Sequence, residues 1–121
     1  MKKIRINLPW PPSVNGMYRM GKRGGIYKTK KAADYSTLVR WKLRHKGFET
    51  FDEARLHINI LALPPDKRKR DLDNILKSLL DSLQGILFKD DSQIDKITIT
   101  RGPVESKGKL FVELFEAPKN E

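Results

Sequence analysis

Cysteine is absent from this chain of 121 residues, which excludes disulfide bonds and thiolate metal sites. Its two histidines, His45 and His57, cannot build a zinc site alone. No stretch approaches the 18 apolar residues of a membrane span, and residues 1–10 lack the long apolar core of a signal peptide. We therefore expect a soluble, cytoplasmic protein whose chemistry does not depend on sulfur.

Acidic residues are scarce in the first part of the chain. Residues 1–48 hold thirteen Lys and Arg residues but a single acid, Asp34, whereas residues 49–121 hold twelve Lys and Arg residues and fourteen acids. The net charge of +10 favours a polyanionic partner, and nucleic acid is the default candidate. The separation predicts one part that binds phosphate and another that collects carboxylates.

The N-terminal half contains one strand pattern and one helix pattern. Residues 3–8 alternate apolar and polar side chains, which predicts a half-buried strand. Residues 13–29 read as a basic loop or irregular hairpin around Gly24-Gly25. Thr29 is a suitable cap for a helix that runs to Lys46 and ends at Gly47.

The C-terminal half predicts a strand over 54–62 and a helix from Asp71 to about Gln84, with Gly85 just beyond its end. Two further strands, 94–101 and 109–115, are expected to form a closing hairpin. The length suits one domain over 1–121. The predicted fold class is α+β, or mixed α/β, with one mixed sheet and two main helices.

The segment Arg70-Asp71-Leu72-Asp73-Asn74 places two carboxylates at the start of the second helix. Both would reach one hard cation with oxygen ligands, as Mg²⁺ requires. Asp90-Asp91 supplies further carboxylates, but beyond a helix roughly 20 Å long. Asp91 therefore joins the site only if the chain doubles back.

These residues suit the hydrolysis of a phosphodiester. A metal held by Asp71 and Asp73, with a further carboxylate from Asp90-Asp91, would neutralise the anionic substrate. Lys77, one turn after Asp73, would stabilise charge on the phosphate, and the cations of Lys67–Arg70 would hold neighbouring phosphates. We thus predict a metal-dependent nuclease.

Each piece also has a purely structural interpretation. Asp71 and Asp73 suit a helix cap and first turn, Asp73–Lys77–Asp81 suits an ion-pair ladder, and Asp90-Asp91 suits a turn. The Lys67–Arg70 run also suits a solvated loop, and Trp41 and the tyrosines also suit packing rather than stacking on bases. The alternatives are a non-catalytic DNA-binding module and an RNA-binding protein or ribonuclease.

Several segments, taken in order, resemble the RusA family of Holliday junction resolvases. They are Leu8-Pro9-Trp10-Pro11-Pro12-Ser13-Val14-Asn15, Pro65-Asp66-Lys67-Arg68-Lys69-Arg70-Asp71-Leu72-Asp73-Asn74, Lys77, Asp81-Ser82-Leu83 and Phe88-Lys89-Asp90-Asp91-Ser92-Gln93-Ile94.

The resemblance implies a small homodimer that cuts four-way DNA junctions symmetrically with Mg²⁺ or Mn²⁺. It implies that Asp71, Asp73 and Asp91 are catalytic and hold the metal, with Asp90 as the alternative to Asp91, and that Lys77 assists. We assign DNA binding to Lys67–Arg70, Asn15 and Arg19. A twofold dimer also suits a twofold junction, because it offers two matching sites. Both a repair role and a phage-borne role are compatible with this sequence.

Overall fold

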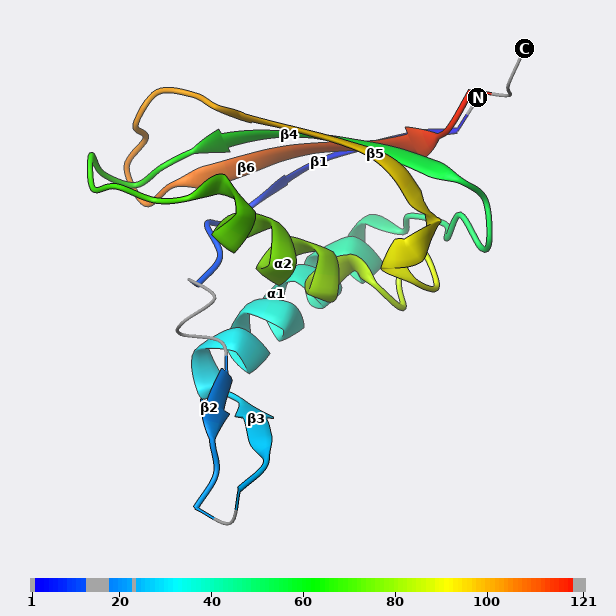
Figure 1. The fold of residues 1–121 in the computed structure, drawn as a ribbon. Helices are drawn as coiled ribbons and strands as arrows, with labels where there is room; N and C mark the ends of the chain where they lie inside the picture. The colour runs from blue at the N-terminus through cyan, green and yellow to red at the C-terminus, as the bar shows by residue number, and fades with distance from the viewer. Residues whose placement is uncertain (1, 13–17, 23, 119–121) are drawn as a thin grey trace.

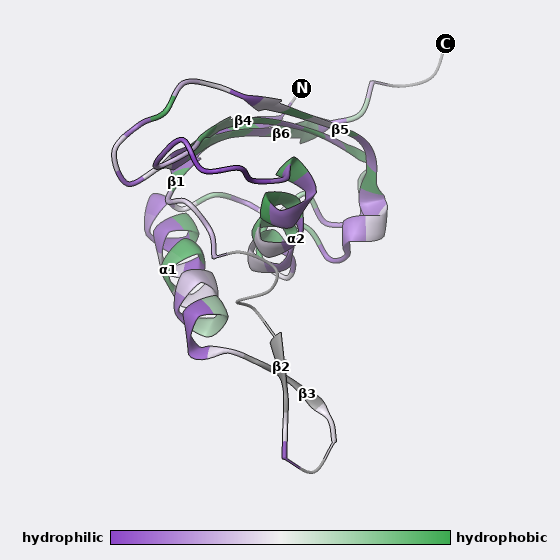
Figure 2. Ribbon diagram, turned by 60° about the vertical axis from the view of Figure 1, so that its left-hand side comes forward, coloured by the Kyte–Doolittle hydropathy of each residue, from purple (hydrophilic) through white to green (hydrophobic). Residues whose placement is uncertain are grey.

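The computed structural model describes residues 2–12, 18–22 and 24–118. A four-stranded mixed sheet has the order β1-β6-β4-β5. Its strands are β1 (Lys3–Leu8), β4 (Leu56–Leu63), β5 (Ile94–Arg101) and β6 (Lys109–Glu116). Both long helices, α1 (Lys30–Lys46) and α2 (Leu72–Leu83), lie on the same side of the sheet (Figures 1 and 2). The predicted α+β class is therefore confirmed.

The first strand and the first helix form where the sequence predicts them. In β1 the alternating residues Ile4, Ile6 and Leu8 are buried, and their neighbours are exposed. The Thr29 hydroxyl accepts a hydrogen bond from the Ala32 amide at 3.4 Å and caps α1. Gly47 ends the helix with φ 70°, a backbone conformation that glycine adopts without a steric penalty.

The predicted hairpin of the last two strands is wrong. β5 pairs in parallel with β4, whereas β6 lies between β1 and β4 and is antiparallel to both. The seven-residue connection 102–108 is longer than most hairpin loops, and it carries the chain past β4. β6 buries Leu110, Val112 and Leu114, which suits a central strand, while β5 is an exposed edge.

The β4–α2–β5 unit determines where the predicted site residues lie. The helix buries an apolar face built from Ile75, Leu79, Leu80 and Leu83 against the core, as its 3.6-residue period predicts. Arg101 at the end of β5 donates to the carbonyl oxygen of Arg70, just before α2, at 2.5 Å. β5 therefore ends near the start of α2, and its own start lies toward the other end of that helix.

The basic segment around Gly24-Gly25 forms a hairpin, which confirms one of the two alternatives, loop or hairpin, that the sequence predicts there. β2 (Tyr18–Met20) pairs antiparallel with β3 (Ile26–Lys28), and both glycines have positive φ. The hairpin projects from the body of the domain below α1 in Figure 1. Among the residues that the structure describes, no helix has the length and apolar character of a membrane span.

Candidate active site

A cleft of about 720 Å³ opens where the loop between β4 and α2 meets the N-terminal proline segment. Its walls are strongly cationic and contain one carboxylate, that of Asp71. The lining residues are Trp10, Pro11, Pro12, Lys31, Pro65, Arg68, Lys69, Arg70, Asp71, Asn74 and Ile75. The cleft therefore joins two segments of the predicted site, although they are some 60 positions apart in the sequence.

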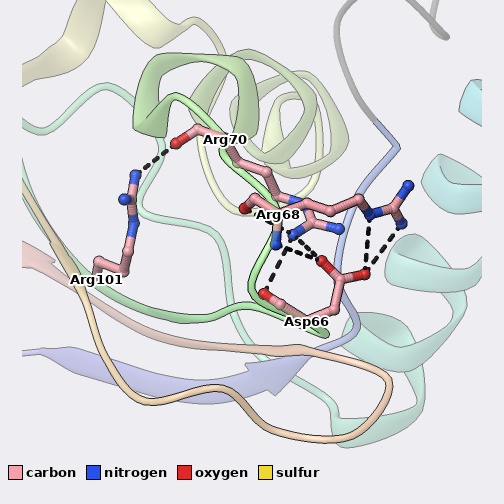
Figure 3. Close-up of polar contacts among 4 residues, drawn as sticks. All are labelled: Asp66, Arg68, Arg70 and Arg101. Carbon is pink, nitrogen blue, oxygen red and sulfur yellow. Dashed lines mark hydrogen bonds and ion pairs between the residues drawn. The ribbon is translucent and has the colours of Figure 1, made fainter.

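Asp66 organises the cationic loop (Figure 3). Its Oδ1 accepts from Arg70 Nη1 at 2.6 Å and from the Arg68 amide at 3.0 Å. Its Oδ2 accepts from the Arg68 guanidinium, with Nη2 at 3.0 Å and Nε at 3.2 Å. One carboxylate thus fixes two of the four successive cations.

These contacts also set the charge state of the loop. Hydrogen bonds from Arg70, and then from Arg68, hold the pKa of the Asp66 carboxyl far below its usual range. Asp66 is consequently ionised at any physiological pH. In the described part of the chain, Lys67 and Lys69 make no ion pair, and both are exposed. They are the loop's available cations for an incoming phosphate.

Arg70 is held on three sides. Its guanidinium carbon lies 5.8 Å from the centre of the Trp10 ring, and its carbonyl oxygen accepts the hydrogen bond from Arg101 (Figure 3). With Asp66 as the third contact, the residue immediately before the acidic start of α2 has a defined position. Because Arg70 and Asp71 are consecutive, the fixed position of Arg70 also constrains the backbone of Asp71.

Asp71 and Asp73 are exposed at the start of α2. Asp71 occupies the N-cap position, but its side chain makes no capping hydrogen bond. Among the described residues neither carboxylate has an ion-pair or hydrogen-bond partner, although five cations (Lys31 and Lys67–Arg70) lie within the loop and the cleft wall. The capping role that the sequence equally allowed is therefore not filled by the Asp71 side chain.

Lys77 lies one turn further along α2 and is about half exposed. Its ammonium group is 3.8 Å from Asp81 Oδ2, an i,i+4 ion pair. The ion-pair interpretation thus holds for Lys77 and Asp81. It does not extend to Asp73, whose carboxylate makes no ion pair among the described residues.

Asp90 and Asp91 have separate roles in a short 3-10 helix, η2 (Asp91–Gln93). Asp90 caps it: its Oδ2 accepts from the Ser92 amide at 3.0 Å. Hydrogen bonding by the Ser92 side chain, and then by this amide, lowers the pKa of the Asp90 carboxyl. The Asp91 amide donates to Gln84 Oε1 at 3.1 Å, and its carboxylate is exposed and unpaired in the described structure. Of this pair, Asp91 has the available carboxylate.

The three predicted metal ligands do not meet within one chain. Asp91 is anchored to Gln84 at the end of α2, and Asp71 precedes the start of α2. About 20 Å of helix rise separates these two ends. Among the described residues, no three acidic or histidine side chains converge closely enough to hold a metal ion. The chain doubles back only after Asp91, because β5 runs from Asp91 to Arg101, which contacts Arg70.

Two predicted DNA ligands cannot be placed. Asn15 lies outside the described residues, and Arg19 lies in β2, for which the backbone alone is described. Conversely, no role was predicted for Asp66 or Arg101, although both position Arg70. Trp10, predicted as a packing anchor, lies against the Arg70 guanidinium. Asp66 had a detectable signal, because an acid followed by four cations must pair with some of them.

This arrangement defines a class of protein: a small α+β domain that presents exposed, unpaired carboxylates beside a strongly cationic cleft. The chain belongs to the RusA family, whose model, Endodeoxyribonuclease RusA, matches residues 9–114. The chain is 40% identical over 118 residues to the crossover junction endodeoxyribonuclease RusA of Enterobacteria phage HK97, covering 96% of this chain and 97% of that protein. It is 32% identical over 117 residues to the proteins of the same name in Escherichia coli K12 and Enterobacteria phage 82, with the same coverage.

Proposed function

We propose that this protein is a crossover junction endodeoxyribonuclease that hydrolyses phosphodiester bonds in four-way DNA and requires Mg²⁺ or Mn²⁺. The observation that carries the proposal is the unpaired carboxylate pair, Asp71 and Asp73, directly after a loop of four cations. The names of the relatives support the reaction and the substrate. The two phage relatives support a phage or prophage origin.

The described residues suit a divalent metal by their chemistry. Asp71 and Asp73 offer exposed oxygen ligands, which hard cations prefer. A bound divalent cation would supply phosphate neutralisation and a water of lowered pKa. Lys67 and Lys69 would attract backbone phosphates to the cleft, and Asp66 would keep Arg70 directed at its wall. Lys77, with its exposed ammonium group, is the nearest cation along α2 to Asp73.

The third ligand, Asp91, is proposed to come from a second copy of the chain. It lies at the opposite end of α2 from Asp71, so one chain does not bring both carboxylates to one ion. In a twofold dimer, the Asp91 end of each copy can face the Asp71 end of the other, which yields two equal sites. Such a dimer would also match the paired cuts that a symmetric junction requires.

Mixing two inactive variants tests this arrangement. Co-expressed Asp71→Asn and Asp91→Asn chains form heterodimers in about half of the molecules. If Asp91 acts on the partner's Asp71, each heterodimer has one fully intact site, and nicking of a labelled junction returns to roughly one quarter of the wild-type rate. If all ligands belong to one chain, both sites of the heterodimer are defective.

The two homodimeric variants must both be inactive for the mixture to be informative, and Asp90→Asn supplies the matched control. Asparagine caps a helix as well as aspartate, so that variant should keep its structure and cleave. Recovery of cleavage in the mixture supports the shared site. Without recovery, Asp91 either acts in its own chain or does not bind the metal. The non-catalytic DNA-binding alternative predicts no cleavage by wild-type protein with Mg²⁺ or Mn²⁺.

A further inference from the structure

The outer face of α1 carries an exposed pair of stacked rings. Trp41 is 60% exposed, more than any other large apolar side chain among the described residues. Its ring lies parallel to that of His45, with 5.0 Å between the ring centres and 7° between the planes. Tyr35 on the same helix is buried and donates to the Pro9 carbonyl oxygen, so it has no such role. An aromatic pair of this kind, left in water, presents a flat surface to a ligand.

The rings form part of a defined hollow with two arginines. A pocket of about 600 Å³ is lined by Thr37, Arg40, Trp41, Arg44 and His45. The Arg44 side chain is exposed and makes no ion pair in the described structure. The Arg40 guanidinium is held in place, because its Nη2 donates to the Gln84 carbonyl oxygen at 3.3 Å. Its Nε is buried and without a hydrogen-bond partner.

The charged side chains that line this pocket, those of Arg40 and Arg44, are both positive. From Tyr35 to Lys46, α1 contains four Lys and Arg residues and no acid. A second copy seated here about a twofold axis would bring Arg44 and Arg40 against their own counterparts, which is unfavourable. An anionic ligand with a flat apolar part satisfies both the cations and the rings. A nucleotide has this combination of a phosphate and an aromatic base.

The pocket also adjoins the segment that holds Asp91. Arg40 contacts the carbonyl oxygen of Gln84, and the side chain of the same Gln84 accepts the Asp91 amide hydrogen bond. One residue thus connects the ring pocket to the acid proposed as the third metal ligand. DNA bound near Asp91 would therefore lie close to α1 as well.

We propose that Trp41 and His45 bind an unpaired nucleobase by stacking, with Arg40 and Arg44 contacting the flanking phosphates. This is a second DNA-binding site, apart from the cleft at Asp71, and it recognises bases that have left the double helix. It rests on the proposed function only in that DNA is the substrate. No base edge is read, because the pocket offers planes and charges, so little sequence preference is expected.

The test measures the affinity of the full-length protein for a short single-stranded oligonucleotide, a duplex and a four-way junction, in EDTA to prevent cleavage. Trp41→Ala should weaken single-strand binding roughly 5- to 100-fold, the usual effect of one stacked base. Duplex binding should change less than twofold, since its bases are already stacked. Arg44→Gln should lower the slope of log K against log salt for the single strand by about 0.7.

Leu38→Ala is the matched control, because Leu38 is 48% exposed on the same helix and does not line the pocket. It should leave all three affinities unchanged. The inference is overturned if Trp41→Ala weakens duplex and single-strand binding equally, or if it changes the sedimentation behaviour of the protein while affinity stays constant. Cleavage of the junction by wild-type protein in Mg²⁺ tests the proposed function separately, so the two failures can be told apart.

Discussion

Asp66 Oδ1 accepts a hydrogen bond from Arg70 Nη1 at 2.6 Å, so the residue before the acidic start of α2 is fixed by the residue that begins the cationic loop. Arg70→Gln should therefore raise the pKa of the Asp66 carboxyl toward its ordinary value of about 3.9. Lys69→Gln, which removes a cation without a contact to Asp66, should leave that pKa low. A carbon-13 NMR titration of the aspartate carboxyls measures both.

The direction of the pH dependence follows from that lowered pKa. A group whose pKa is lower in the folded protein stabilises the fold above its unfolded pKa and loses this effect as pH falls through the folded value. The stabilisation of the fold by Asp66 should thus be complete above about pH 4 and decline below it, while the contacts themselves persist until pH approaches the lower folded pKa. Chemical-shift changes of the Arg68 and Arg70 side chains between pH 4 and 7 would contradict this.

Gln93 should be important for stability although it lies outside the cleft. Its buried side chain accepts from the amides of Lys89 and Asp90 at 2.8 and 2.9 Å and donates to the carbonyls of Asp52 and Ala54 at 2.7 and 3.0 Å. Gln93→Ala leaves these groups without partners and should lower the free energy of unfolding by about 2–4 kcal/mol. Urea denaturation measures the loss.

Gln84→Ala is a suitable comparison for Gln93→Ala, since the half-buried Gln84 side chain accepts a single hydrogen bond, from Asp91. Gln84→Ala should lower the free energy of unfolding by about 1 kcal/mol. Equal losses in the two variants would mean that Gln93 does not organise the segment around η2. Junction cleavage should fall in both, because each variant releases the backbone beside Asp91.

Local patterns were sufficient to predict most elements, whereas strand partners were not. Alternation in β1, the Thr29 cap and the apolar face of α2 are properties of neighbouring residues, so the sequence shows them directly. The pairing of β5 with β4 depends on the path of the 102–108 connection, which neighbouring residues do not encode. The same pairing directs β5 from Asp91 toward Arg101, so the arrangement of the sheet also determines which acids of one chain lie near each other.

The sequence indicates candidate site residues but not the contacts that they make. The Asp-Leu-Asp-Asn segment and the basic loop before it are recognisable as a candidate site because their charged residues are dense and adjacent in the sequence. That Asp66 pairs with two arginines, or that Trp10 packs against Arg70, requires a turn whose geometry is set by Pro64-Pro65 and the neighbouring strand end. Such contacts do not produce a periodic pattern of residues in the sequence, so the sequence does not predict them.

Asp71→Asn should separate binding from catalysis. The substitution removes no cation, so affinity for the junction should be unchanged or slightly higher. Cleavage should fall about a thousandfold, which corresponds to about 4 kcal/mol of lost metal-dependent stabilisation. The measurements are a binding titration in EDTA and a single-turnover cleavage assay in Mg²⁺. Asp34→Asn, which neutralises an exposed acid of α1, should cleave normally.

Salt titrations distinguish the two kinds of cation in the loop. Lys67 and Lys69 are exposed and make no ion pair in the described structure, so Lys67→Gln and Lys69→Gln should each flatten the slope of log K against log salt by up to about 0.9. Arg68 and Arg70 are held by Asp66, and Asp66→Asn releases them. That variant should bind duplex DNA more tightly with a steeper slope, yet cleave the junction more slowly, because Arg70 no longer fixes Asp71. A flatter slope after Asp66→Asn would show instead that the carboxylate presents the arginines to DNA.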